Sequence, residues 1–98
     1  MVSKVSEIAI EDVASYIRAT DTDGIDTYLN IAKSYISSYT GIPVTSEEGE
    51  SLDDFPDFVI VVYVLCQDMY DNRTLYVDKS NINKMVQTIL DMHTRNNL

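Results

Sequence analysis

Apolar residues recur at helical spacing in three segments of the chain, and this pattern predicts three amphipathic helices. The first covers residues 10–17, where acidic side chains in the opening turn suit the positive end of a helix dipole. The second is expected over about residues 23–40, because Gly41 is well placed to end it. The third opens at Ser80 or Asn81, either of which can cap a helix. The three apolar stripes consist of Ile10, Val13, Ala14 and Ile17, then Ile25, Tyr28, Leu29, Ala32, Ile36 and Tyr39, then Ile82, Met85, Val86, Ile89 and Leu90.

Nine uninterrupted apolar residues, 58–66, could form either a buried strand or a helix. Their β-branched side chains suit a strand. A helix is favoured because Asp53 or Asp54 can cap it, Pro56 suits a first turn, and apolar residues continue at helical spacing further on. We therefore predict a helix over residues 56–73, about 27 Å long. The expected fold is all-α: a small bundle of about four helices with a long central helix.

The first half of this central helix is apolar on every side. Ile60, Val61 and Val64 occupy the sector that Asp68 and Asp71 hold further along. A helix that is apolar all round must be covered all round. Three other short helices are expected to supply too little cover, so we predict that a neighbouring subunit contributes. We then expect Ile60, Val64 or the acidic loop from Thr45 to Asp54, which comes just before this end of the helix, to lie in or beside a subunit contact.

Charge is distributed unevenly along the 98 residues, a length that suits a single domain, 1–98. The net charge is −9, and no basic residue occurs between Lys33 and Arg73. Residues 42–54 read as an acidic loop, because they are polar, contain Pro and Gly and show no apolar period. So acidic a surface repels phosphate, and we expect no measurable binding of duplex DNA at physiological salt. The acidic residues between the two cations are Glu47, Glu48, Glu50, Asp53, Asp54, Asp57, Asp68 and Asp71.

No set of residues that would support catalysis, a metal or a cofactor can be assembled from the sequence. One cysteine and one histidine are too few for a zinc site. The segment DTDGID, residues 21–26, begins like a calcium loop, but its glycine stands fourth instead of sixth and Ala32 holds the twelfth position. Cys66 is expected to be a buried, unreactive thiol, and His93 to pack near a helix end. We therefore expect no enzyme, no metal and no cofactor.

The sequence also carries no sign of a membrane or secretory segment. Its first ten residues lack the apolar core of a signal peptide. The longest apolar run is far shorter than the ~20 residues that span a bilayer. We expect a soluble protein that is made inside the cell and has no membrane partner.

Motifs along nearly the whole chain resemble those of one protein family. Ile-x-Ile-Glu-Asp-Val-x-x-Tyr-Ile, at residues 8–17, precedes an Asp-x-Asp-Gly turn and a second segment that ends Tyr-Thr-Gly at residues 39–41. After the acidic loop, the apolar segment ends Met-Tyr-Asp-Asn-Arg at residues 69–73. In this order, they look like the small head–tail connector proteins of long-tailed bacteriophages, also called head-completion or DNA-packaging adaptors. Residues 80–98 resemble the family's last helix only in pattern.

The resemblance implies an all-helical structural subunit that assembles into a homo-oligomeric ring, twelve-fold in the virion. The ring would sit below the portal protein after DNA packaging and extend the DNA channel, with DNA passing through without specific binding. Its other partner would be a downstream head-completion or tail protein. The protein would be made in the bacterial host cytoplasm and would reside at the head–tail interface. The candidate subunit-interface or structural residues are Ile60, Val64, Tyr70, Asn72, Arg73, Glu47, Glu48 and Glu50.

Arg73 is the first cation after a long acidic stretch, so we expect its guanidinium to pair with a carboxylate of its own or an adjacent subunit. Two functions from other classes stay open. A small acidic protein can be a DNA mimic that inhibits a nucleic-acid-binding enzyme, or a dimeric adaptor in bacterial regulation.

Overall fold

The computed structural model describes residues 4–19, 22–47, 49–72, 74–75, 77 and 82–94. These residues form four α-helices and two short 3₁₀ helices, and none of them lies in a strand, so the predicted all-α fold is confirmed. The elements in chain order are η1 (Val5–Glu7), α1 (Ile10–Ile17), α2 (Ile25–Thr40), η2 (Leu52–Asp54), α3 (Asp57–Asn72) and α4 (Lys84–Met92).

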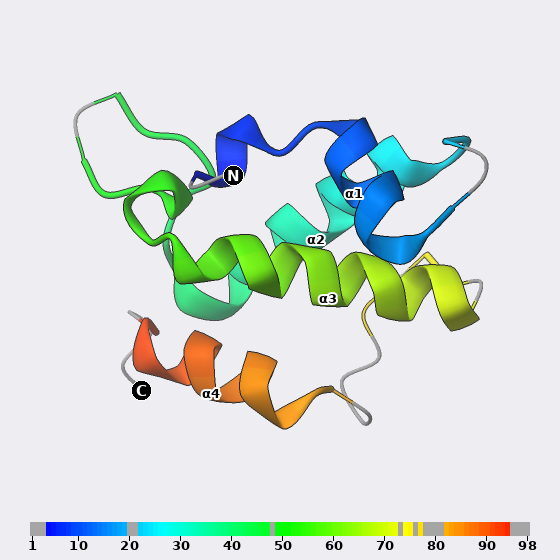
Figure 1. Ribbon diagram of the computed structural model, residues 1–98. Coiled ribbons are helices and arrows are strands. Elements are labelled where there is room, and N and C mark those ends of the chain that lie inside the picture. The colour runs from blue at the N-terminus through cyan, green and yellow to red at the C-terminus, as the bar shows by residue number, and fades with distance from the viewer. Residues whose placement is uncertain are drawn as a thin grey trace.

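The helix α3 runs through the middle of the bundle and contacts the other three α-helices and η1. Figure 1 shows α1 above it, α4 below it and α2 behind it. The loop between α2 and α3 extends from one end of α3, beside the 3₁₀ helix η1 (Figure 1). Among the described residues, no helix covers the side of α3 opposite α2 (Figure 1).

The predicted start of α1 and the predicted end of α2 are confirmed, whereas α2 begins at Ile25, two residues after its expected start. Asp12, in the first turn of α1, accepts a hydrogen bond from the Ala9 backbone N–H at 2.8 Å. At the end of α2, Gly41 takes a left-handed conformation with φ 79°, and its N–H donates to the Ser37 carbonyl at 2.9 Å. Glycine adopts this conformation without the strain that a Cβ would add, which explains why the helix ends there.

The beginnings of the last two helices differ from the prediction. Asp54 is not a cap of α3: it belongs to η2, where its carboxylate accepts from the Ser51 N–H at 3.0 Å. The first acidic residue of α3 is Asp57. The N-cap of α4 is Asn83, whose side-chain oxygen accepts from the Met85 N–H at 2.7 Å. The expected caps at residues 80 and 81 were therefore wrong, and those two residues lie outside the described part of the chain.

The prediction that the apolar run of α3 needs a neighbouring subunit for cover was wrong for most of the run. Val61 is fully buried within the single chain. The extra cover comes from outside the α-helices, because Val5, Ile42 and Leu52 are also fully or almost fully buried in the same core. Only Ile60 and Val64, with the tyrosine at position 63, are half-buried within the run. The residues of α3 that the chain itself buries are Phe58, Val59, Val61, Val62, Leu65, Cys66 and Met69.

Candidate interaction surfaces

The outward side of α3 carries a row of four side chains that we call the outer α3 stripe: Ile60, Val64, Gln67 and Asp71. At about 100° per residue, these positions share one side of the helix, opposite its buried side. The first three are half-buried and Asp71 is exposed. Gln67 donates to the carboxylate of Asp71 at 3.3–3.4 Å. The stripe is therefore apolar toward the start of α3 and polar toward its end, as the sequence predicted, but two residues of the predicted sector lie outside it: Val61 is buried in the core, and Asp68 borders the stripe.

A titratable side chain lies on each flank of the stripe, and partial burial raises the pKa of both. Partial burial raises the pKa of Asp68, and the nearby charge of Asp71 adds to this rise. On the other flank, Tyr63 stacks against the exposed Tyr16 of α1, with ring centroids 5.0 Å apart and planes 13° from parallel. Burial first, and then the charge of Asp12, raises the pKa of Tyr63, so its hydroxyl stays protonated at neutral pH.

Tyr70 and Asn72, at the polar end of α3, make their contacts within the chain. Tyr70 is half-buried and meets Tyr28 of α2 edge to face, with ring centroids 6.4 Å apart, so it joins the two helices. Asn72 is exposed and donates to the Asp68 carbonyl at 2.9 Å, which satisfies a carbonyl in the last turn. Arg73 lies outside the described residues, so its expected ion pair stays a prediction.

The two ends of the acidic loop, which we call its base, are held by buried side chains and hydrogen bonds, and exposed acidic residues lie between them. Ile42 and Leu52 are fully buried, and the Leu52 N–H donates to the Pro43 carbonyl at 3.1 Å, which closes the loop. Glu47 and Glu50 are exposed at its tip. Glu48 lies outside the described residues. The base is also held from the N-terminal side, because Asp53 accepts from the Ser6 N–H at 2.8 Å.

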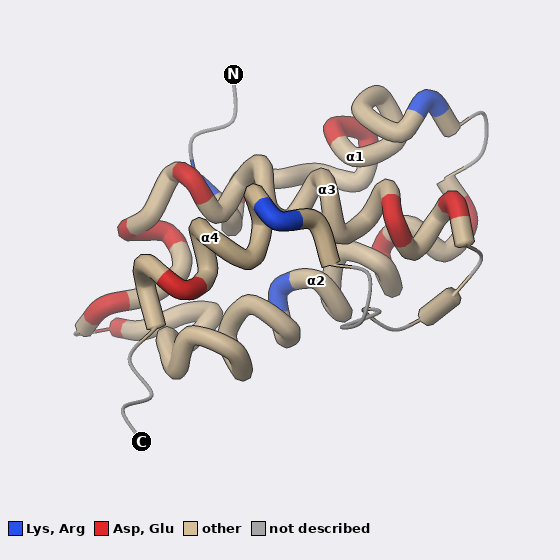
Figure 2. The backbone as a smooth tube through the Cα atoms, turned by 90° about the horizontal axis from the view of Figure 1, so that it is seen from below, with Lys and Arg blue, Asp and Glu red and all other residues tan. Residues whose placement is uncertain are grey.

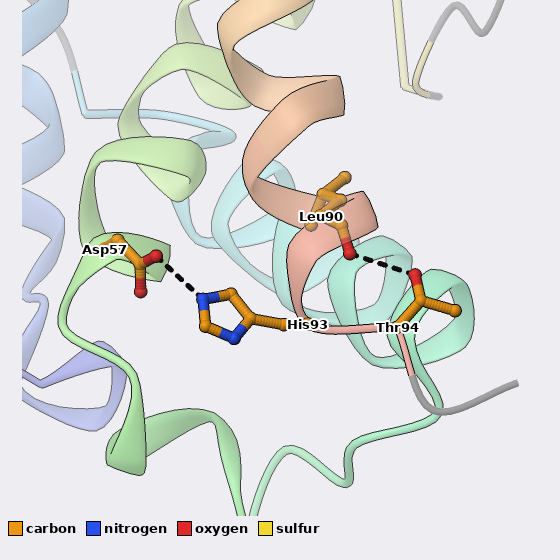
Figure 3. Close-up of polar contacts among 4 residues, drawn as sticks. All are labelled: Asp57, Leu90, His93 and Thr94. Atoms are coloured by element: carbon orange, nitrogen blue, oxygen red, sulfur yellow. Dashed lines mark hydrogen bonds and ion pairs between the residues drawn. The ribbon is translucent and has the colours of Figure 1, made fainter.

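A polar contact that the sequence pattern did not reveal joins the end of α4 to the start of α3. Nε2 of His93 lies 2.8 Å from a carboxylate oxygen of Asp57 (Figure 3). The rings of Phe55 and Phe58 enclose the imidazole, with centroids 4.6 and 5.1 Å away. His93 had been expected only to pack near a helix end. Its partner is 36 residues away, and helical periodicity carries no information about such a pair.

The described residues offer little reactive chemistry. They contain no group of three or more His, Cys, Asp or Glu side chains that could hold a metal ion. Cys66 is fully buried, and burial raises the pKa of its thiol to about 12, so the thiol is protonated and inaccessible at neutral pH. In the same part of the chain, no helix has the length and apolar character that crossing a bilayer requires.

No protein-family model, curated protein or solved structure matches this chain. The likeness to phage connector proteins therefore rests on the motifs in the sequence alone.

Proposed function

We propose that the protein is a structural head-completion subunit of a bacteriophage, which forms a ring below the portal and joins the head to the tail. The observation that carries the proposal is the position of the two connector-like motifs. Tyr-Thr-Gly, residues 39–41, stands at the end of α2, and Tyr-Asp-Asn, residues 70–72, closes α3. Tyr70 packs against Tyr28 in the first turn of α2, so the two motif-bearing helices contact each other, at the end of α2 opposite Tyr-Thr-Gly.

The outer α3 stripe supports an assembling subunit. Ile60 and Val64 are the aliphatic side chains of the apolar run that the chain leaves half-buried, and they lie on the side without a covering helix. Contact with another subunit would remove this apolar surface from water, which is the main favourable term in association. The exposed Glu47 and Glu50 would lie near the start of α3, where their negative charges suit a channel that DNA passes without binding.

Assembly is the test of this function. The purified protein, alone and mixed with the portal protein of the phage or prophage that encodes it, would be examined by electron microscopy and analytical ultracentrifugation. We expect rings or a portal complex for the natural chain and for Thr88→Asp, which places a charge on an exposed position of α4. Val64→Asp is expected to abolish assembly while circular dichroism still shows a folded helical protein. Loss of the fold in Val64→Asp would show that this side chain is core, and absence of any portal complex with the natural chain would refute the function.

The proposed passage of DNA without binding can be tested separately, by measuring whether the protein binds duplex DNA. Because the chain has 7 Lys and Arg against 16 Asp and Glu, we expect no gel shift with duplex DNA at physiological salt. A tight, sequence-independent shift would contradict this role.

The DNA-mimic alternative is less well supported. A mimic needs carboxylates spaced like the phosphates of a strand, whereas the carboxylates of α3 itself stand only at its two ends. Asp57 stands at its start and Asp68 and Asp71 near its end, with the apolar part of the stripe between them. A stoichiometric complex with a basic nucleic-acid enzyme, formed by a monomer that never assembles, would favour the mimic.

A further inference from the structure

Beyond the first turn of α2, which contains Asp26, the outward face of this helix carries no carboxylate, although the chain is strongly acidic. No Asp or Glu occurs from residue 27 to residue 46, and Lys33 is the only charged side chain in that stretch. The exposed positions of α2 beyond its first turn are occupied by small polar residues, among them Asn30, Ser34 and Ser38. In Figure 2 the tube of α2 is accordingly almost uncharged, while acidic segments lie along α3 and the loop.

A groove follows this face. It has a volume of about 500 Å³, and its described lining residues include Asn30, Ile31, Ser34, Tyr35, Leu75 and Val77. A second hollow of about 310 Å³ shares Tyr35 with it and continues toward α4. Leu75, at 62% exposure, is among the most exposed large apolar side chains of the described residues. We call the first hollow the α2 groove. Its described lining combines apolar surface with hydroxyl and amide groups and contains neither a carboxylate nor a cation.

The α2 groove and the outer α3 stripe lie on opposite sides of the molecule. The two helices pack with their buried sides toward each other, and at about 100° per residue Ser34 and Ile60 each lie opposite the buried side of their own helix. Figure 1 agrees with this arrangement, because among the described residues α2 lies behind α3 and no helix lies in front of α3. A copy that presents one face can therefore receive another copy on the other face.

The charges favour a second copy of this chain as the occupant of the groove. Two molecules that each carry a net charge of −9 repel, so they can touch only where carboxylates are absent or meet hydrogen-bond donors. The groove meets both conditions, because its described lining residues include no carboxylate and Asn30 and Ser34 can donate to one. The stripe offers the complement: Ile60 and Val64 for the apolar wall, and Asp71 as an acceptor. A cationic partner would suit the stripe but would gain nothing from an uncharged groove.

We propose that the outer α3 stripe of one copy packs into the α2 groove of the next copy. The contact is heterologous: each subunit uses two different patches, and repetition gives a closed ring if the rotation between copies closes and a filament if it does not. This inference rests on the proposed function in that it names the contact by which the ring closes. It can nevertheless be tested on the isolated protein.

Thiol cross-linking of the full chain tests the contact. Ile60→Cys and Ser34→Cys place one thiol on each face, and the buried Cys66 is not expected to react with a bismaleimide. At millimolar protein concentration, we expect the double variant to give a ladder of dimers, trimers and larger species on a denaturing gel. An equimolar mixture of the two single variants should stop at dimers, because each molecule then carries one reactive face.

Two controls make the result decisive. Each single variant alone should stay monomeric, and Ile60→Cys combined with Thr88→Cys, on the exposed side of α4, should give no ladder. Dimers from either single variant alone would indicate a symmetric contact and overturn the proposal, as would a double variant that stays monomeric. The two proposals fail separately. A ladder without any portal complex removes the connector function and leaves this contact, whereas rings that never form the cross-link remove the contact and leave the function.

Discussion

The division of α3 into core positions and an open stripe predicts that two identical substitutions, one turn apart, have very different effects. Val61→Ala and Val64→Ala each remove the same two carbon atoms and make the same small gain in helix propensity. Val61 is fully buried, whereas Val64 is half-buried on the outward side. The pair therefore isolates burial from every local property of the helix.

The expected magnitudes follow from the burial of each side chain. At Val61, the lost transfer free energy is about 1.6 kcal/mol, from ~0.8 kcal/mol for each carbon. A residual cavity of up to roughly 50 Å³ would add about 1 kcal/mol at ~24 cal/mol per Å³. Better helix propensity returns ~0.5 kcal/mol, so Val61→Ala is expected to lower the free energy of unfolding by about 2 kcal/mol. At Val64 the smaller transfer loss and the same propensity gain nearly cancel, and the change should stay below about 0.5 kcal/mol.

Urea unfolding of the monomer, followed by the helical signal in circular dichroism, measures both changes. Since the domain is small, ~2 kcal/mol corresponds to a fall in Tm of roughly 8–16 °C, which thermal unfolding would resolve. The slope of the free energy of unfolding against urea concentration should be the same for both variants, because the surface area exposed on unfolding hardly changes. Equal losses at the two positions would refute the division of α3 into a core side and an open side.

Two further predictions concern the polar and titratable groups. A double-mutant cycle with Asp57→Asn and His93→Gln should give a coupling of about 0.5–1 kcal/mol, because Asp57 is 38% and His93 19% exposed and water screens the pair. A coupling of zero would show that His93 stabilises α4 through its aromatic contacts and not through Asp57. Burial raises the pKa of Cys66 from its ordinary 9.0 to about 12, so the folded state disfavours the thiolate. The thiol's contribution to stability is complete below about pH 9 and is lost toward pH 12, at up to ~1.4 kcal/mol for each pH unit. In urea unfolding measured between pH 8 and 11, the free energy of unfolding should fall less steeply with rising pH for Cys66→Ala than for the natural chain. Equal slopes for the two proteins would contradict the burial argument.

Local signals predicted the helices whose ends depend on local chemistry. The apolar spacing and the acidic first turn indicated α1, and Gly41 indicated the end of α2, because both depend on residues within one or two turns. The buried, unreactive state of Cys66 also followed from its neighbours in the chain. The half-buried state of Ile60 and Val64 was anticipated from the sector that they share with later aspartates.

The cover of α3 could not be predicted in the same way. The short 3₁₀ helices have no apolar period, so nothing in the sequence marked Val5 and Leu52 as residues of the core in which Val61 is buried. The same omission made Asp54 look like a cap of α3 when it closes η2. The α2 groove was missed as well, because it depends on how residues after α3 lie against α2, which is a tertiary contact that periodicity does not contain.

The attachment of α4 to the bundle is unequal along its length. Near its C-terminal end, Asp91 accepts a hydrogen bond from Tyr39 of α2, and His93 pairs with Asp57 of α3. In the first turn of α4, Met85 is exposed, and the first side chain buried in the core is Val86. Among the described residues, the polar contacts of α4 thus lie from its middle to its C-terminal end, and its first turn is joined to the core through Val86 and the partly buried Ile82 just before it, so the two halves of the helix depend on different kinds of contact.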